Sequence, residues 1–332
     1  KDIVSDKPIR INGGLTTDNF DIGRLIGKDF VHQVSLKTSI RANLGKGYPA
    51  VDIDSLRIDR LNLLGYDYSG INATGKLADN AFDGRIVCND PNLSFMFQGL
   101  ATLSSTAENA LYRFSAYLGY ADLHALNIDK RDVSRMSLGS LDANFERVGQ
   151  GDLVGRIDAE DLQFESANGM HDIGDLHVTS TSGGENYGIK LTSDFLDGTY
   201  DGTRSIGNIA RDIQDITTRK EIGALFGEPS GEWGGGAYRI ALNFHDSRDL
   251  LSFLAPGAYI ADSTAIRMRI TEGGRLTGNI TSPRLAYKDK YIKSVNLDLD
   301  NADNALNCTV TGTELALSSA IRMKNNALML YA

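Results

Sequence analysis

The residue types that could perform chemistry begin with two closely spaced pairs of carboxylates. Asp52 and Asp54 form one pair, and Asp298 and Asp300 form the other. Two carboxylates that share a strand face could act as acid and base or hold a calcium ion. Both pairs fall on the polar side of an alternating segment, so the sequence favours a solvated strand surface over a catalytic or metal site.

Histidines and sequence motifs add no catalytic constellation. His171 and His177 are the closest pair among the five histidines, and their spacing matches no common zinc pattern. The sequence has no nucleophile elbow, zinc-protease helix, phosphate-binding loop or dinucleotide-binding loop. We therefore expect no enzymatic activity, no catalytic residue, no cofactor and no metal site.

Three further side chains have more than one interpretation. Cys88 and Cys308 each fall on the apolar side of an alternating segment, which is typical of small buried residues. A disulfide between them requires the two segments to be neighbours, which the sequence does not decide. Trp233, in the glycine-rich stretch GEPSGEWGGG, could stack on a sugar or fold back on the sheet, and the second interpretation is preferred.

Most of the chain alternates apolar and polar residues, as half-buried antiparallel strands do. The clearest segments are 34–44, 93–103, 153–159, 187–191, 238–244, 266–270 and 295–299. Ala-Asp-Asn-Ala occurs at 78–81 and again at 302–305, each time between two such segments, which predicts a hairpin corner used twice. The pattern predicts a mainly β fold with one polar and one apolar face.

The apolar face is mainly aliphatic, and only 8% of all residues are aromatic. This composition fits an elongated antiparallel sheet that curls into a trough, whose lining could hold acyl chains. It also fits two sheets that cover each other in a closed sandwich. Composition alone does not separate the two arrangements and would favour the sandwich.

Helical patterns are few. A short helix is expected near 17–29, capped by Asp18, and another within 246–256, capped by Asp246 or Ser247 and stopped by Pro256. Isoleucines at helical spacing predict an amphipathic helix within 205–226. We therefore predict a first β-sheet unit at 1–202, a helical insert and glycine-rich linker at 203–230, and a second β-sheet unit at 231–332. The helical interruption as a whole covers about 203–256.

Charge and chain ends limit the possible partners. The net charge of -9 argues against nucleic acid, which requires a basic face, and weakly against an anionic membrane surface. No apolar segment is long enough for a transmembrane helix, and no signal peptide is present. Since the chain begins with Lys1 and ends within a strand-like segment, we expect an internal piece of a larger protein.

Five longer motifs follow one another along the chain. They are GGLTTDNFDIGRLIGKD (13–29), DPNLSFMFQGLATLS (90–104), YLGYADLHALNI (117–128), LTSDFLDGTYDG (191–202) and TSPRLAYKDKYIKSVNLDLDN (281–301). Their order resembles the middle part of TamB-type translocation and assembly module proteins, of the AsmA-like superfamily, in the form typical of Bacteroidota. The resemblance covers about residues 10–202 and, more loosely, 230–332.

This resemblance implies a periplasmic segment of an envelope protein that is anchored in the inner membrane of a Gram-negative bacterium. Such proteins form a curled β-sheet with a hydrophobic interior, carry no catalytic residues, and serve phospholipid transfer or outer-membrane protein assembly with a barrel partner. The helical insert departs from the family pattern and puts an unbroken groove in question. The expected partners are phospholipid or acyl chains, and an outer-membrane barrel protein is a further candidate.

The residues predicted to line the groove share the apolar side of their segments. They are Leu36, Ile40, Leu93, Phe95, Phe97, Leu297 and Leu299. The alternative is a structural or carbohydrate-binding surface β-module with a closed core, in which the same residues are ordinary core residues.

Overall fold

The computed structural model describes residues 9–27, 29–44, 50–103, 110–148, 152–183, 186–203, 236–301, 306–318 and 321–331. The helix expected within 205–226, Trp233 and the second Ala-Asp-Asn-Ala copy lie outside the described residues. The chain divides into two compact units, Lys1–Asp172 and Ile173–Ala332. The division predicted from the sequence, with boundaries at 202 and 230, stays a prediction.

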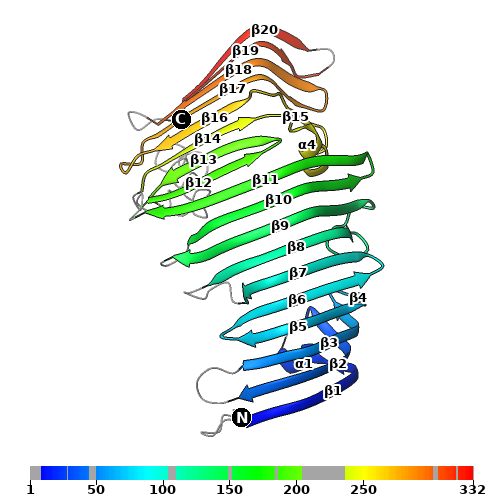
Figure 1. Ribbon diagram of the computed structural model, residues 1–332. Coiled ribbons are helices and arrows are strands. Elements are labelled where there is room, and N and C mark those ends of the chain that lie inside the picture. The colour runs from blue at the N-terminus through cyan, green and yellow to red at the C-terminus, as the bar shows by residue number, and fades with distance from the viewer. Residues whose placement is uncertain are drawn as a thin grey trace. The chain divides into compact units, whose positions relative to one another are not determined.

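The described residues are mainly β, with 20 strands that pair in antiparallel fashion, and the sheet of each unit does not close on itself (Figure 1). This confirms the predicted fold class. The strands that lie in the first unit are β1 (Ile9–Asp21), β2 (Val31–Leu44), β3 (Ala50–Leu63), β4 (Tyr66–Tyr68), β5 (Ile71–Ala78), β6 (Ala81–Asp90), β7 (Leu93–Thr102), β8 (Leu111–Asp122), β9 (Ser134–Val148) and β10 (Asp152–Ser166). Apart from the short β4, which pairs with β3, each strand pairs with its neighbour along the sheet, β5 following β3.

The second unit repeats this meander. β11 (Gly169–Gly183) begins in the first unit. It is followed by β12 (Asn186–Ser193), β13 (Leu196–Gly202), β14 (Tyr238–Phe244), β15 (Ala258–Ile260), β16 (Ala265–Ile270), β17 (Leu276–Tyr287), β18 (Lys290–Asp300), β19 (Asn307–Ala316) and β20 (Arg322–Tyr331). The short β15 pairs with β17, so the main meander passes from β14 to β16.

The first Ala-Asp-Asn-Ala copy forms the hairpin corner that its sequence predicts. Asp79 and Asn80 have φ angles of 49° and 58°, and Ala78 pairs with Ala81 across the turn between β5 and β6. Both central residues are therefore left-handed, as in the turns that match the twist of a β-hairpin. Asp and Asn tolerate this backbone conformation better than most residues, which explains the choice of residues.

The two described helices are short. α1 (Ile22–Ile26) begins after Asp21, whose carboxylate accepts a hydrogen bond from the Arg24 backbone at 3.1 Å. The predicted cap, Asp18, is wrong, because Asp18 still belongs to β1 and accepts a hydrogen bond from Ser35 Oγ. α4 (Arg248–Leu254) begins after Ser247 and ends before Pro256, as predicted.

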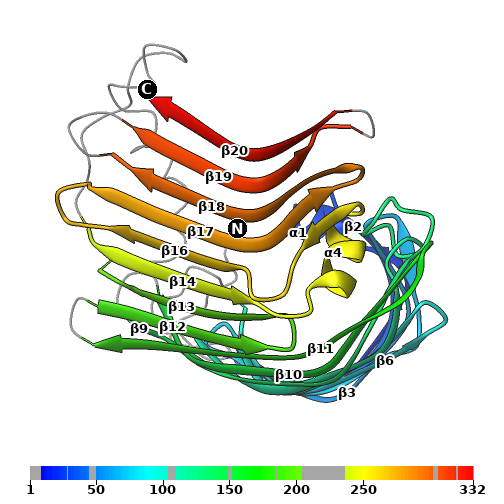
Figure 2. The ribbon, with the colours of Figure 1, turned by 90° about the horizontal axis from the view of Figure 1, so that it is seen from above.

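Several strands are bent within their length, as Figure 2 shows for β17 to β20. A left-handed residue lies inside β1 (Asn19), β10 (Asp161), β18 (Ser294) and β20 (Asn325). Such a residue turns the chain and interrupts the regular alternation of side chains. In β9 the position opposite Asp161 is Gly139, where an added Cβ would lie 2.8 Å from the Asp161 side chain. The bends give each unit a curled sheet, in agreement with the predicted curl.

Glycines allow the strands of the first unit to approach closely. Gly84 on β6 pairs directly with Gly75 on β5 and with Gly99 on β7. A Cβ on Gly84 would lie 2.3 Å from the Thr74 carbonyl oxygen and 2.7 Å from the Phe82 ring. The ring thus covers the bare backbone, an arrangement that compensates for glycine in a strand.

Gly84→Ala is therefore expected to lower the free energy of unfolding by roughly 1–3 kcal/mol, because both backbone and ring must move. Gly13→Ala is the matched control, since a Cβ there meets no atom within 4 Å. Thermal and urea denaturation of both variants measures the difference. Equal stability of the two variants would contradict the close approach.

Candidate functional site

The apolar side chains of the first unit form rows that run across the strands. Residues that pair directly between antiparallel strands share a face of the sheet, so the register defines each row. The first row crosses the strands from β2 to β9, without β4. It contains Leu36, Ile58, Ile71, Cys88, Phe95, Leu118 and Leu138. Except for Cys88, all of these side chains are half-buried. We call the surface that carries this row the apolar face of the first unit.

The other predicted lining residues of this unit lie on the same face. Phe97 pairs with Ile86 and belongs to the adjacent row. Its ring centroid lies 5.0 Å from that of Phe114. Ile40 pairs with Ile53 one row further on. All of these side chains are half-buried, so the face is neither a dry core nor fully open to water.

Leu93 lies at one end of the apolar face, where a small core forms. Tyr68, Ala121 and Leu126 are buried there, and Leu93 packs against them. Leu126 is only 1% exposed, although it belongs to the connection between β8 and β9. This connection therefore covers one end of the apolar face, where Ile71 and Leu118 of the first row also pack against the small core.

The second unit has an equivalent apolar face. One row, from β11 to β20 without β15, contains Val178, Leu191, Gly198, Leu242, Ile266, Ile280, Leu297, Val310 and Leu328. Leu299 belongs to the adjacent row, where it pairs with Cys308 and continues to Leu330. Leu297 and Leu299 are half-buried, and Leu328 and Leu330 are 55% and 54% exposed.

A second small core closes one end of these rows. Tyr200, Tyr238, Ile270 and Leu276 are buried, and Leu299 packs against them. The structure therefore places all seven predicted residues on apolar faces, five in the first unit and two in the second. Sequence alternation did not reveal the two small cores, because their members come from strand ends and connections.

The opposite face of each unit is polar, and it carries the two carboxylate pairs. Asp54 accepts a bidentate hydrogen bond from Arg41, which holds the pKa of this carboxyl group below its usual value despite some desolvation. Asp298 accepts from Asn279 at 2.7 Å, and Asp300 pairs with Arg275 at 2.9 Å. These contacts agree with a solvated strand face.

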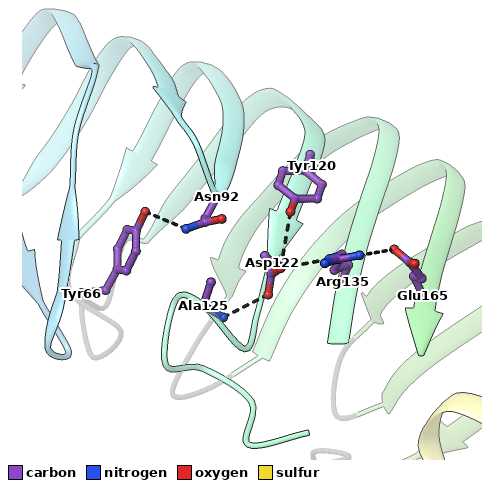
Figure 3. A network of polar contacts seen from close by, with 7 residues as sticks. All are labelled: Tyr66, Asn92, Tyr120, Asp122, Ala125, Arg135 and Glu165. Atoms are coloured by element: carbon purple, nitrogen blue, oxygen red, sulfur yellow. Dashed lines mark hydrogen bonds and ion pairs between the residues drawn. The ribbon is translucent and has the colours of Figure 1, made fainter. Parts of the chain in front are cut away.

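A polar network fixes the connection that covers the apolar face of the first unit (Figure 3). Asp122 accepts hydrogen bonds from the Ala125 backbone at 3.0 Å and from Arg135 Nε at 2.9 Å. Arg135 also reaches Glu165 at 3.1 Å. Burial would raise the pKa of Asp122, but these hydrogen bonds, with one from Tyr120, lower it below its usual value. The network holds the backbone turn that carries Leu126.

Asp90, the first residue of the DPNL motif, forms a second buried polar site. Tyr66 donates its O–H to Oδ1 at 2.5 Å, the Asn92 backbone donates to Oδ1 at 2.8 Å, and the Ser69 backbone and hydroxyl donate to Oδ2. Burial alone would raise the pKa of Asp90, but these donors together lower it. Burial and the bond to Asp90 raise the pKa of Tyr66 to about 12.

Tyr66→Phe is expected to cost about 1–3 kcal/mol of stability near neutral pH, because Asp90 loses a donor while it stays buried. A raised pKa contributes stability that is fully present below the unfolded value of about 10. The contribution is lost as the pH rises through about 12. The stability gap between the two proteins should therefore narrow in this alkaline window.

A spectrophotometric titration of the tyrosines gives a direct readout for this site. The late ionisation, with a pKa of about 12, should disappear in Tyr66→Phe. It should persist in the control Tyr117→Phe, whose side chain is exposed. An unchanged titration in Tyr66→Phe would contradict the assignment.

The remaining sequence candidates do not come together. His171 is buried, and its Nε2 lies 2.8 Å from Ser166 Oγ. Cys88 and Cys308 are both free, in different units. Within the described ranges, no group of three or more His, Cys, Asp or Glu residues could hold a metal ion.

The chain matches no protein-family model, no curated protein and no solved structure with which it was compared. In the part of the chain that the structure describes, no helix is both long and apolar enough to cross a membrane.

Proposed function

We propose that this chain is a non-enzymatic, lipid-handling β-segment of a cell-envelope protein. In this proposal the two apolar faces accept the acyl chains of phospholipids, either for transfer between membranes or during the assembly of outer-membrane proteins. The periplasmic location, the inner-membrane anchor of the parent protein and an outer-membrane barrel partner belong to the same proposal. They rest on the resemblance to TamB-type proteins.

One observation carries the proposal: the rows of apolar side chains are continuous across many strands, yet most of their side chains are only half-buried. In the first unit, the row from Leu36 to Leu138 contains no charged side chain. A packed core would bury such a row fully, whereas large exposed apolar surfaces mark sites of interaction. The row therefore has apolar area left to offer to a ligand.

The chemistry of the rows suits a ligand that moves. Each methylene that an apolar row removes from water contributes about 0.8 kcal/mol. Neighbouring positions along a row are chemically similar, so an acyl chain could shift by one strand without losing a specific contact. The row from Leu36 to Leu138 contains no charged side chain, so it offers no fixed site for a headgroup.

The proposal is tested by native mass spectrometry of the chain purified without detergent, followed by lipid extraction of the same sample. Bound phospholipid or fatty acid in near-stoichiometric amount is the expected result. An apo mass, with no uptake after incubation with short-chain phospholipid, would instead favour a structural β-module whose apolar faces serve only packing.

A further inference from the structure

A cavity of about 480 Å³ lies on the polar face of the first unit, over β1, β2, β3, β5 and β6. Three of the side chains that line it are small and polar, namely Ser39, Ser55 and Thr74, and we call these three the base of the cavity. The β2–β3 register shifts beside this base, between Ser39 and Ile40, where β3 contains a bulge. The bulge and the small residues together leave a depression between longer neighbours, of a volume typical of small-molecule sites.

The long side chains around this depression are cationic. Lys37 and Arg57 pair directly across β2 and β3, and Arg85 pairs with Thr74 across β5 and β6. All three line the cavity, together with the amide of Asn72, and no carboxylate lines it. Like charges directly opposite one another destabilise a sheet, so the pair of cations favours an anion between them.

The charges of these three residues are only partly compensated. Arg57 Nε donates to Asp59 Oδ1 at 2.7 Å, on its own strand. Arg85 Nη2 has a weak contact to Met96 Sδ at 3.4 Å. Among the described residues, no ion pair joins a carboxylate to Lys37 or Arg85. Two cations therefore remain available to a ligand.

We propose that this cavity binds a phosphate group. A phosphate monoester presents several acceptor oxygens and about two negative charges, and every polar side chain that lines the cavity can donate a hydrogen bond to it. Arginine binds such oxygens in bidentate fashion and lysine as a point charge, and the hydroxyls of the serines and threonines that line the cavity complete the donor set. The site lies on the face opposite the proposed acyl-binding rows. The phosphate-binding proposal can therefore be confirmed or overturned independently of the proposed function.

The phosphate could belong to a free small molecule or to a lipid headgroup, and two probes separate these sources. Isothermal titration calorimetry with inorganic phosphate tests the first, and co-flotation with phosphatidylcholine vesicles that contain phosphatidate tests the second. Because the chain carries a net charge of -9, general attraction of anions is not expected to mimic a local site.

Two variants of the full chain test the residues. Lys37→Gln/Arg85→Gln removes two charges from the cavity, and it should weaken binding by at least about tenfold, since charged hydrogen bonds are lost. Ser39→Tyr keeps the charge but fills the base of the cavity, and it should weaken binding similarly. The control Lys76→Gln/Arg113→Gln removes the same charge from exposed positions that do not line the cavity.

If the wild type and the control bind inorganic phosphate and both cavity variants do not, the cavity is a site for free phosphate compounds. Binding to phosphatidate vesicles alone, with the same dependence on the variants, supports a headgroup site. Binding of neither probe overturns the proposal. Equal losses in the control and the cavity variants overturn it as well, because they indicate general electrostatics.

Discussion

Phe95→Asp is expected to abolish acyl-chain uptake by the first unit while the protein remains folded. Phe95 lies within the apolar row from Leu36 to Leu138 and is half-buried, so its replacement does not place a charge in a dry core. A bound acyl chain would, however, seal the new carboxylate away from water. Burying an unpaired charge is costly, and we expect affinity for lipid to fall by at least about tenfold.

The neighbouring residue provides a matched control. Met96 is also half-buried, but it belongs to the opposite face, where it pairs with Val87 and contacts Arg85. Met96→Asp adds the same charge one residue away and should keep bound lipid. Native mass spectrometry reports the lipid, and circular dichroism reports the fold. If both variants keep lipid, or if both lose it, the apolar row is not the binding surface.

The second unit allows the same comparison with Leu297→Asp and Asn296→Asp. A third variant, Leu276→Asp, is the reference for a charge placed in a fully buried core, because Leu276 is 0% exposed. This variant should fail to fold, since its carboxylate has no access to water. If Phe95→Asp and Leu297→Asp also fail to fold, their positions belong to a closed core, and the lipid-binding proposal loses its surface.

Much of the fold could be predicted from the sequence, because period-two alternation directly reports half-buried strands. The hairpin at Asp79 and Asn80 was also predictable, because Asp and Asn favour the left-handed backbone that this turn requires. The bends inside strands were not predictable in this way. Asp161 and Ser294 have a left-handed backbone within segments that otherwise alternate. One such residue shifts the alternation of apolar and polar residues at a single place, which is too small a change in the sequence pattern to indicate a bend.

The candidate site was predictable in part. Alternation correctly assigned Leu36, Phe95 and Leu297 to apolar faces, but it could not tell which residues pair across strands. The rows exist only through the register, which depends on contacts between distant segments. Leu126 was missed because it lies in a connection, where its burial depends on the turn held by Asp122.

The phosphate-binding cavity has no signature in the sequence. Lys37, Arg57 and Arg85 are far apart along the chain, and each taken alone looks like an ordinary charge on a solvated strand. Pairing across β2 and β3, and a bulge that displaces neighbouring residues, bring them to one depression. A sequence pattern could at most have shown that all three lie on polar sides.

Asp90→Asn is expected to lower the free energy of unfolding by about 3 kcal/mol near neutral pH, because several donors converge on one buried carboxylate. An amide offers only one acceptor oxygen, and its NH2 group would face donors that Asp90 now satisfies. Ser69 and Tyr66 hold β4 and the start of β5 through this carboxylate. We therefore expect local loosening of the small core around Tyr68 before the rest of the unit unfolds.

The pH dependence of this effect has a definite sign. The folded pKa of Asp90 lies below its usual value, so its contribution is fully present above the unfolded value of about 3.9. It is lost as the pH falls through the folded pKa. The stability difference between wild type and Asp90→Asn should hence be constant near neutrality and shrink below about pH 4. Urea denaturation at several pH values measures this difference, with Asp83→Asn, an exposed carboxylate on β6, as the control. A difference that stays constant down to the acid limit would show that Asp90 acts through shape and not through its charge.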